Sequence, residues 1–357
     1  MPEPTAAVLR HFPCRQCGAK VEFAPGTTSL VCPYCQTHND IMVEGKAEEL
    51  DFVATLASLE QAAPHVSVRV MKCQACAAEV TVGATTTSLM CSFCGTNIVS
   101  QIESASRVKP NGVLPFAIAR EKAVDSFRSW LKSRWFAPGA LKGQSLIDEQ
   151  LSGVYLPAWT YDCKADTSYS GQRGDAYYVT VGSGKNRRTE RRIRWRSVSG
   201  RVHDRFDDVL VLASQSLEPK MIRALEPWDL KAVKPYADEF LAGFRAECYQ
   251  IDLKGGWSTA QQIMAPTIDA TIRSDIGGDE QRITWKHSAY SAITFKYLLL
   301  PVWVSAYRYK GKVYRFLVNA RTGEVQGQRP YSPWKIAGVI VLGLIVIGAI
   351  ILFVSRQ

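Results

Sequence analysis

The sequence lacks every motif that would assign a common catalytic reaction to it. Its 357 residues contain no complete phosphate-binding loop, G-x-G-x-x-G fingerprint, H-E-x-x-H motif or G-x-S-x-G elbow. Gly182–Lys185 resembles the end of a phosphate loop, but the leading glycine and the hydroxyl residue after the lysine are missing. We therefore expect no catalytic residue and no enzyme activity, although an enzyme with an unrecognised site stays an alternative.

Histidine is scarce, with five residues in the chain. One compact cluster combines histidine and aspartate, and it consists of His203, Asp204, Asp207 and Asp208. It precedes the apolar residues Val209–Leu212, so we expect these side chains to cap or solvate a loop rather than to bind a metal.

A secretory signal is also missing, because Met1–Arg10 has no apolar core after a basic start. Eight of the ten cysteines form a regular pattern that could pair as disulfides in an oxidising compartment. Without a signal we favour reduced thiols. The remaining Cys163 and Cys248 are expected to be buried structural thiols.

The cysteine pattern is C-x2-C-x14-C-x2-C, and it occurs twice with an offset of 59 residues. The two sets are Cys14, Cys17, Cys32 and Cys35, and Cys73, Cys76, Cys91 and Cys94. Each C-x2-C pair can form a knuckle that directs two thiolates at one point, and two knuckles complete a tetrahedral zinc site. The pattern predicts two zinc ribbons, at 12–43 and 71–102, with one Zn²⁺ each.

Four thiolates leave no coordination position for water, so both zinc ions are predicted to be structural. A ribbon of about 30 residues buries too little apolar surface to fold alone, and metal binding supplies the missing free energy.

The ribbons have no basic surplus. Residues 1–110 contain eight Lys and Arg against ten Asp and Glu, whereas the rest of the chain contains 35 against 23. Phosphate binding depends on the neutralisation of phosphate charge by cations. Nucleic acid is therefore an unfavoured partner for the ribbons, and we expect them to bind protein.

The basic surplus has one dense run, made of Lys185, Arg187, Arg188, Arg191, Arg192, Arg194 and Arg196. Gly182–Gly184 precedes it and indicates a hairpin, and alternation places Arg192, Arg194 and Arg196 on one face of a strand. The run is predicted to contact anionic lipid, an acidic partner or nucleic acid. The alternative is a solvated hairpin.

The region 150–330 reads as a β-rich α+β domain with an antiparallel sheet. A linker is expected at 44–70 and an amphipathic helix at Ala119–Trp135 within 113–140. Strands are expected at Tyr155–Tyr169, Ala176–Val181, Arg191–Val202, Val209–Ala213, Ile283–Lys286, Ile293–Arg308 and Lys312–Val318. Helices are expected at Ala237–Tyr249 and at Thr259–Asp275, the second broken at Pro266.

Ile336–Val354 contains 19 residues without a charge or an amide. At 1.5 Å per residue it extends about 28 Å, close to the thickness of a bilayer core. Residues 335–354 are therefore predicted to be a C-terminal transmembrane anchor rather than a buried core helix. The basic residues before it are Lys310, Lys312, Arg315, Arg321, Arg329 and Lys335, against Arg356 alone after it. This asymmetry predicts that the N-terminal bulk is cytoplasmic.

The ribbon pair resembles the ribbon of transcription factor IIB, and the chain resembles a family of bacterial zinc-ribbon membrane proteins. The segments that carry the resemblance are Gly153–Tyr161 (GVYLPAWTY), Gly171–Asp175 (GQRGD), Ser199–Val209 (SGRVHDRFDDV), Gly277–Gln281 (GGDEQ), Leu300–Trp303 and Phe316–Gly323 (FLVNARTG). Members are often labelled as relatives of the primosomal replication helicase. This chain has no Walker motif and no room for two motor domains, so that label implies no activity here. The resemblance implies flotillin-like (SPFH) membrane scaffolds as a partner class.

Together these features predict a single-pass protein of the bacterial inner membrane that acts as a cytoplasmic adaptor or scaffold. Its ribbons would reach out to recruit a protein partner, and its basic hairpin would orient it against anionic lipid. The alternative is a membrane-linked nucleic-acid-binding protein that uses the basic strand 185–196.

Overall fold

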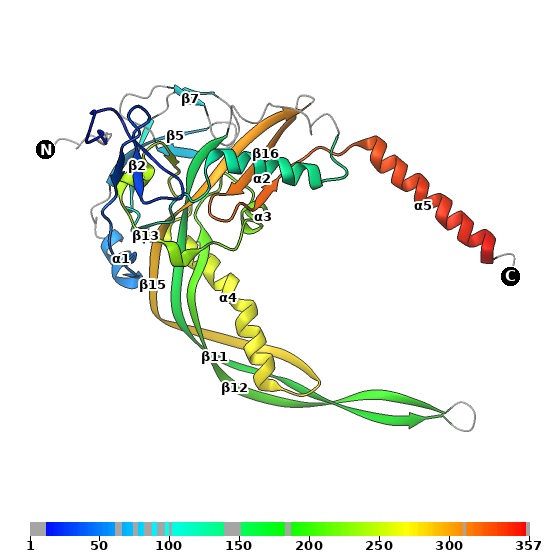
Figure 1. The fold of residues 1–357 in the computed structure, drawn as a ribbon. Coiled ribbons are helices and arrows are strands. Elements are labelled where there is room, and N and C mark those ends of the chain that lie inside the picture. Colours follow the sequence, from blue (N-terminus) through cyan, green and yellow to red (C-terminus); the bar gives the residue numbers. More distant parts are fainter. Residues whose placement is uncertain are drawn as a thin grey trace.

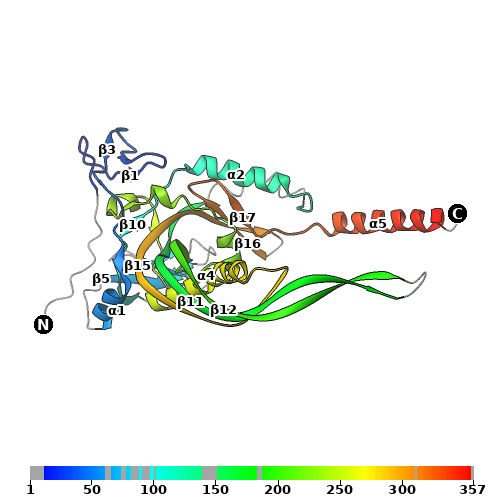
Figure 2. The same cartoon turned by 90° about the horizontal axis from the view of Figure 1, so that it is seen from below.

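The computed structural model describes residues 12–60, 66–73, 78–81, 88–90, 97–99, 102–138, 151–182, 187–309 and 312–354. Figures 1 and 2 show a rounded body from which a long β arm and the helix α5 (Pro333–Val354) project. The first ribbon lies at the opposite end of the body from both projections.

Three unusually long strands form the centre of the fold. They are β11 (Ser152–Val181), β12 (Arg188–Leu212) and β15 (Glu280–Tyr309). The strand β11 lies in the middle and pairs antiparallel with both neighbours, so the predicted antiparallel sheet is confirmed. Outside the body the same strands continue as the arm (Figure 1).

Both faces of the central strand are covered where it crosses the body. Tyr155, Trp159 and Tyr161 point into one apolar cluster, whereas Val154 and Leu156 belong to a second cluster. Successive side chains of a strand point to opposite faces, so this division places one core on each side of the sheet. The continuous apolar run around GVYLPAWTY is explained by this two-sided burial.

The helix α4 (Leu253–Ile276) packs along the arm against β11, β12 and β15. Its buried residues recur at every third or fourth position, and they are Leu253, Gly256, Ala260, Met264, Ile268, Ile272 and Ile276. Asp252 caps its start, where Oδ1 accepts a hydrogen bond of 2.7 Å from the N–H of Gly255. The helix runs through Pro266, so the predicted break there is wrong.

The strands are longer than predicted because the expected loops remain paired. Gly171, within the segment expected to separate two strands, pairs with Ile283 and Val198. A Cβ atom on Gly171 would lie 2.4 Å from the carbonyl oxygen of Arg282, so glycine permits the close approach of β15. The expected pairs of short strands are thus single strands in β11, β12 and β15.

Shorter elements complete the body. The helices are α1 (Phe52–Glu60), α2 (Arg120–Ser133) and α3 (Pro219–Arg223), with 3-10 turns η3 (Leu230–Ala232) and η4 (Asp238–Leu241). Strands that join the large sheet are β4 (Leu50–Asp51), β10 (Gly112–Val113), β13 (Lys234–Pro235), β14 (Arg245–Ala246), β16 (Lys312–Asn319) and β17 (Val325–Gly327). The ribbon regions contain β1 (Glu22–Phe23), β2 (Ser29–Val31), β3 (His38–Asp40), β5 (Val66–Lys72), β6 (Glu79–Thr81), β7 (Ser88–Met90), β8 (Asn97–Val99) and β9 (Ile102–Arg107).

The amphipathic helix expected within Ala119–Trp135 is confirmed as α2, but the helix expected at Ala237–Tyr249 is wrong. That segment forms η4 and β14 instead. Its apolar residues do not line one helical face, because Phe240 packs on Phe23 of the first ribbon and Phe244 stacks on Phe116. The spacing of Phe240 and Phe244 therefore reflects two separate tertiary contacts and not the face of a helix.

Candidate metal centre and exposed surfaces

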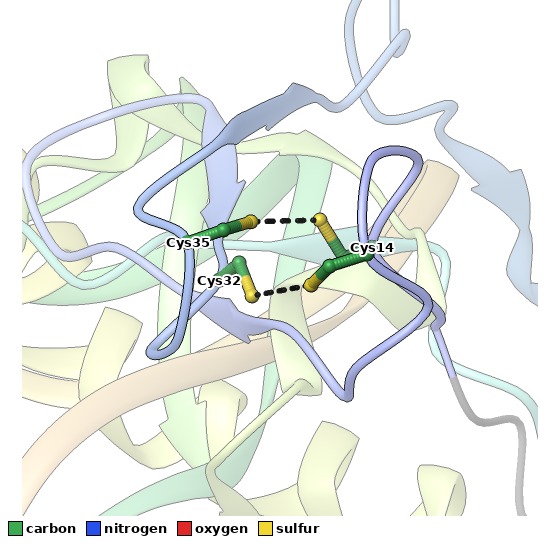
Figure 3. A group of neighbouring side chains, drawn as sticks. Cys14, Cys32 and Cys35 are labelled. Atoms are coloured by element: carbon green, nitrogen blue, oxygen red, sulfur yellow. Dashed lines mark hydrogen bonds between the residues drawn. The ribbon is translucent and has the colours of Figure 1, made fainter.

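Four cysteine thiols meet in the first ribbon. Cys14 and Cys17 come from one loop and Cys32 and Cys35 from another, and all four sulfur atoms lie within 4.8 Å of one another. Figure 3 shows Cys14 facing Cys32 and Cys35 across a common centre. This cluster could hold a metal ion, and the sequence prediction of one four-cysteine group is confirmed to that extent.

The two loops have the same backbone turn. The N–H of Gly18 donates to the carbonyl of Cys14 at 2.9 Å, and the N–H of Gln36 donates to the carbonyl of Cys32 at 3.0 Å. Both donor residues, each four positions after the first cysteine of its pair, have left-handed φ angles of 71° and 60°. This turn brings the two thiols of each C-x2-C pair to one side.

The sulfur spacing fits a tetrahedral ion. The Sγ atoms of Cys14 and Cys35 lie 3.5 Å apart, and those of Cys17 and Cys32 are also 3.5 Å apart. Four sulfurs at about 2.3 Å from a central ion would be about 3.8 Å from one another, whereas a disulfide requires about 2.05 Å. The spacing therefore supports a metal centre over the disulfide alternative.

The local hydrogen bonds favour thiolates unequally. The hydroxyl and backbone N–H of Thr37 lower the pKa of Cys35 to about 6. The backbone at Ala19 lowers the pKa of Cys17, but the sulfurs of Cys35 and Cys32 outweigh it and raise that pKa to about 12. Four like charges cannot gather without a cation, so metal binding must displace protons from this site.

The first ribbon is built into the body rather than projecting from it. Val21, Phe23 and Leu30 are at most 5% exposed and belong to the main apolar cluster. The N–H of Phe23 donates to the carbonyl of Ala242 at 2.9 Å, and the N–H of Gly26 donates to that of Phe116 at 2.8 Å. The expectation that this ribbon reaches away from the domain is therefore wrong.

The described part of the second ribbon repeats the first. The strands β7 and β8 lie 59 residues after β2 and β3, and their pairing has the same register, with Ser29↔Asp40 matched by Ser88↔Val99. The N–H of Cys14 donates to the carbonyl of Ala19 at 2.7 Å, and the N–H of Cys73 donates to the carbonyl of Ala78 at 2.8 Å. Cys76, Cys91 and Cys94 lie outside the described residues, so a second metal site stays a prediction.

The predicted basic hairpin forms the tip of the arm. The strands β11 and β12 pair as far as Val181↔Arg188, and Gly182 has a left-handed φ of 92° at the turn. The segments 173–182 and 187–196 together carry seven arginines and two carboxylates. Lys185 lies outside the described residues.

The pairing register places Arg192, Arg194 and Arg196 on one face of the tip. Carboxylates neutralise part of the charge, through the pairs Arg196–Asp175 (3.5 Å), Arg188–Glu190 (2.7 Å), Arg192–Glu190 (3.4 Å) and Arg191–Glu280 (2.9 Å). Arg194 lies 5.2 Å from the ring centre of Tyr177. These exposed pairs contribute little stability and leave a positive surface.

The His203 cluster does not converge. His203 Nδ1 contacts the carboxylate of Asp166, whereas the oxygen of Asp204 accepts a hydrogen bond of 2.7 Å from the Thr271 hydroxyl on α4. Within the described ranges, the four-cysteine group is the set of metal-binding side chains that the geometry brings together.

An ion cluster that the sequence did not indicate joins the three long strands β11, β12 and β15. Lys296 Nζ is 2.8 Å from Asp208, 3.1 Å from Glu49 and 3.5 Å from Asp162. Burial raises the pKa of Asp162, whereas the hydrogen bond from Lys296 lowers the pKa of Glu49. The cluster ties residue 49, from the segment expected to be a linker, to the central sheet. The sequence analysis missed this ion cluster because its residues lie far apart along the chain.

The helix α5 is long and apolar enough to cross a membrane, and no part of Pro333–Ile351 is buried. Its 22 residues correspond to about 33 Å. Among the described residues it is the one helix with this length and composition.

The chain is similar to a bacterial protein over about two thirds of its length. A protein of Bacillus subtilis (strain 168), named "Uncharacterized protein YdjG", is 26% identical over 234 residues, which are 65% of this chain and 67% of that protein. No protein-family model matches the chain. No solved structure matches it either.

Proposed function

We propose that the protein is a membrane-anchored adaptor that holds a protein partner at the cytoplasmic face of a bacterial inner membrane. The observation that carries this proposal is the separation of its surfaces. The arm tip and α5 project from one side of the body, and the metal-bearing ribbon lies at the other end (Figures 1 and 2). One end therefore suits a membrane and the other faces away from it.

The metal is zinc, and its role is structural. Four soft thiolate ligands at tetrahedral spacing favour Zn²⁺, and they leave no position for a reacting water. Cys14, Cys17, Cys32 and Cys35 would hold the first ion. The repeated cysteine spacing supports a second one, which Cys73, Cys76, Cys91 and Cys94 would hold.

The membrane end combines α5 with the basic tip. A preponderance of Lys and Arg before α5 keeps the body in the cytoplasm, where reduced thiols can retain zinc. The arm tip lies on the same side of the body as α5 (Figures 1 and 2). Each cation near an anionic bilayer contributes about 1 kcal/mol of attraction, so the tip would orient the body on the lipid surface.

The ribbon end offers a cavity of about 450 Å³ for a partner. Its lining is partly apolar, with Phe12, Val21 and Ile41, and partly polar, with Arg15, Asp40 and Glu239. A cavity with this mixed lining suits a side chain of a protein partner that carries both apolar and polar groups. Flotillin-like (SPFH) scaffolds are the partner class that the family resemblance suggests.

A nucleic-acid-binding role is the second candidate, and the arm geometry is the observation that favours it. The major groove of DNA admits a two-stranded β ribbon, and the tip is such a ribbon with three arginines on one face. Internal ion pairs and the membrane helix make this role the weaker one. Gel-shift assays across a salt series decide it, because phosphate contacts give steep salt dependence.

Photo-crosslinking in intact membranes tests the adaptor role. A photoreactive residue replaces Met42, which is 86% exposed at the ribbon end, or Tyr178, which is 70% exposed at the tip. We expect the Met42 probe to give one protein adduct and the Tyr178 probe to give lipid adducts. Nuclease-sensitive adducts from Tyr178 would support the second candidate, and the absence of a protein adduct from Met42 would contradict the adaptor role.

A further inference from the structure

The start of α5 is held against the end of α2 by a small set of contacts. The N–H of Ser332 donates to the carbonyl of Phe136 at 2.8 Å. Lys335 Nζ donates to the carbonyl of Trp135 at 2.8 Å and to that of Ala137 at 2.9 Å. We call this contact region, residues 127–138 and 325–335, the α2–α5 junction. It fixes where the membrane helix leaves the body.

Among the described residues, three buried N–H donors at the junction have no acceptor. They are Trp130 Nε1, Arg134 Nε and Arg329 Nε. The guanidinium carbon of Arg134 lies 5.0 Å from the centre of the Trp130 ring, and that of Arg329 lies 5.8 Å from it. Both guanidinium groups therefore border one indole. A buried donor without an acceptor is costly, and three around one side chain indicate that an acceptor belongs there.

The charge of the junction favours an anion as this acceptor. The junction contains Arg128, Lys132, Arg134, Arg329 and Lys335 but neither Asp nor Glu. Among the residues that the structure describes, neither Arg134 nor Arg329 forms an ion pair. A guanidinium group presents parallel donors that match the oxygens of a phosphate, and an indole N–H adds a third donor.

The surroundings identify the source of that phosphate. Trp135, Tyr331 and Trp334 are 60%, 58% and 86% exposed at the point where the apolar residues of α5 begin. Tryptophan and tyrosine gather at the level of lipid headgroups because their rings are apolar with one polar edge. An anion at this level is a headgroup phosphate.

We propose that the α2–α5 junction binds the phosphate of an anionic phospholipid between Arg134 and Arg329, with Trp130 Nε1 as a further donor. The inference rests on the proposed membrane insertion of α5 and deepens it. A lipid bound there locks the membrane helix to the body and sets the angle at which the body stands on the bilayer.

Native mass spectrometry of the full-length protein in mild detergent tests this site with added phosphatidylglycerol or phosphatidylcholine. We expect retention of phosphatidylglycerol in preference to phosphatidylcholine. The double variant R134Q/R329Q should bind it about 25-fold more weakly, about fivefold for each lost cation. The matched control R120Q/K122Q loses the same charge from exposed positions of α2 outside the junction and should bind like the wild type.

Two further experiments distinguish a specific lipid-phosphate site from general charge attraction and from a site for free phosphate. The variant R134K/R329K keeps the charge but loses the Nε–H donors, so it should bind more weakly than the wild type; equal binding would reduce the site to general attraction and overturn the proposal. Displacement of the lipid by an equal concentration of inorganic phosphate would also overturn it, because the site would then recognise the free anion.

Membrane extraction at alkaline pH distinguishes this inference from the function on which it rests. Release of the wild type from membranes would refute insertion of α5 itself. A wild type that stays inserted, together with an R134Q/R329Q variant that retains the lipid and unfolds at the wild-type temperature, would refute the phosphate site alone.

Discussion

Metal removal should destabilise the body as well as the first ribbon. Without the ion the four thiols no longer hold the two loops together, and Val21, Phe23 and Leu30 lose the scaffold that presses them into the main core. Each buried side chain of this size contributes about 1.5–3 kcal/mol, so the three together contribute about 5–9 kcal/mol. This sum is an upper bound, because unfolded chains already bury part of their apolar surface.

Hydrogen exchange of the full-length protein in detergent, with and without a chelator, measures the effect. We expect faster exchange in 12–43 and also in 114–118 and 237–244, which supply the carbonyls and rings that contact the ribbon. Cys32→Ala should reproduce the effect. Cys163→Ala is the matched control, because Cys163 is also a buried thiol but lies outside the metal cluster.

A double-mutant cycle gives the size of one contact across this interface. The rings of Phe23 and Phe240 meet edge to face with centroids 5.4 Å apart. Phe23→Ala and Phe240→Ala should therefore show a coupling of about 0.5–1.5 kcal/mol. Unchanged exchange in the body after metal removal, together with a coupling near zero, would refute the conclusion that the ribbon is part of the core.

Three further outcomes follow from the described contacts. Ile272→Ala on the buried stripe of α4 should lower the free energy of unfolding by about 2–5 kcal/mol, whereas Ile263→Ala at a 40% exposed position of the same helix should have a small effect in chemical denaturation. Burial and the hydrogen bond to Asp275 raise the pKa of Tyr169 to about 12. The folded state thus holds this proton more tightly than the unfolded state, whose tyrosine titrates near 10, so stability present below about pH 10 should be lost towards pH 12, and Tyr169→Phe should remove that part of the pH dependence. Metal retention should weaken as the pH falls because protons compete for the thiolates, and a colorimetric zinc assay after acid titration would contradict this if release did not depend on pH.

The parts that the sequence revealed are those in which residue type alone decides the structure. The first four-cysteine group could be predicted because four thiols at fixed spacing have few other uses. α5 could be predicted because a long uncharged run has one common environment. The hairpin followed from Gly182 and the alternating arginines, and the antiparallel pairing of the two strands, which ends at Val181 and Arg188, carries it to the end of the arm.

The parts that the sequence concealed depend on partners far away along the chain. Phe240 and Phe244 have the spacing of a helix, but they serve contacts with Phe23 and Phe116. The ion cluster of Lys296 joins residues separated by up to 247 positions. Pro266 usually ends a helix, yet the buried stripe of α4 holds the helix on the arm through that residue. In each case tertiary packing outweighs local propensity.

The depth of the two ends in a membrane tests the account most directly. The full-length protein, reconstituted into anionic vesicles that carry a quencher on the lipid headgroups, would bear a fluorescent residue in place of Tyr178 or Met42. The account predicts strong quenching at the arm tip and little at the ribbon end. Equal quenching at both positions, or stronger quenching at Met42, would contradict it.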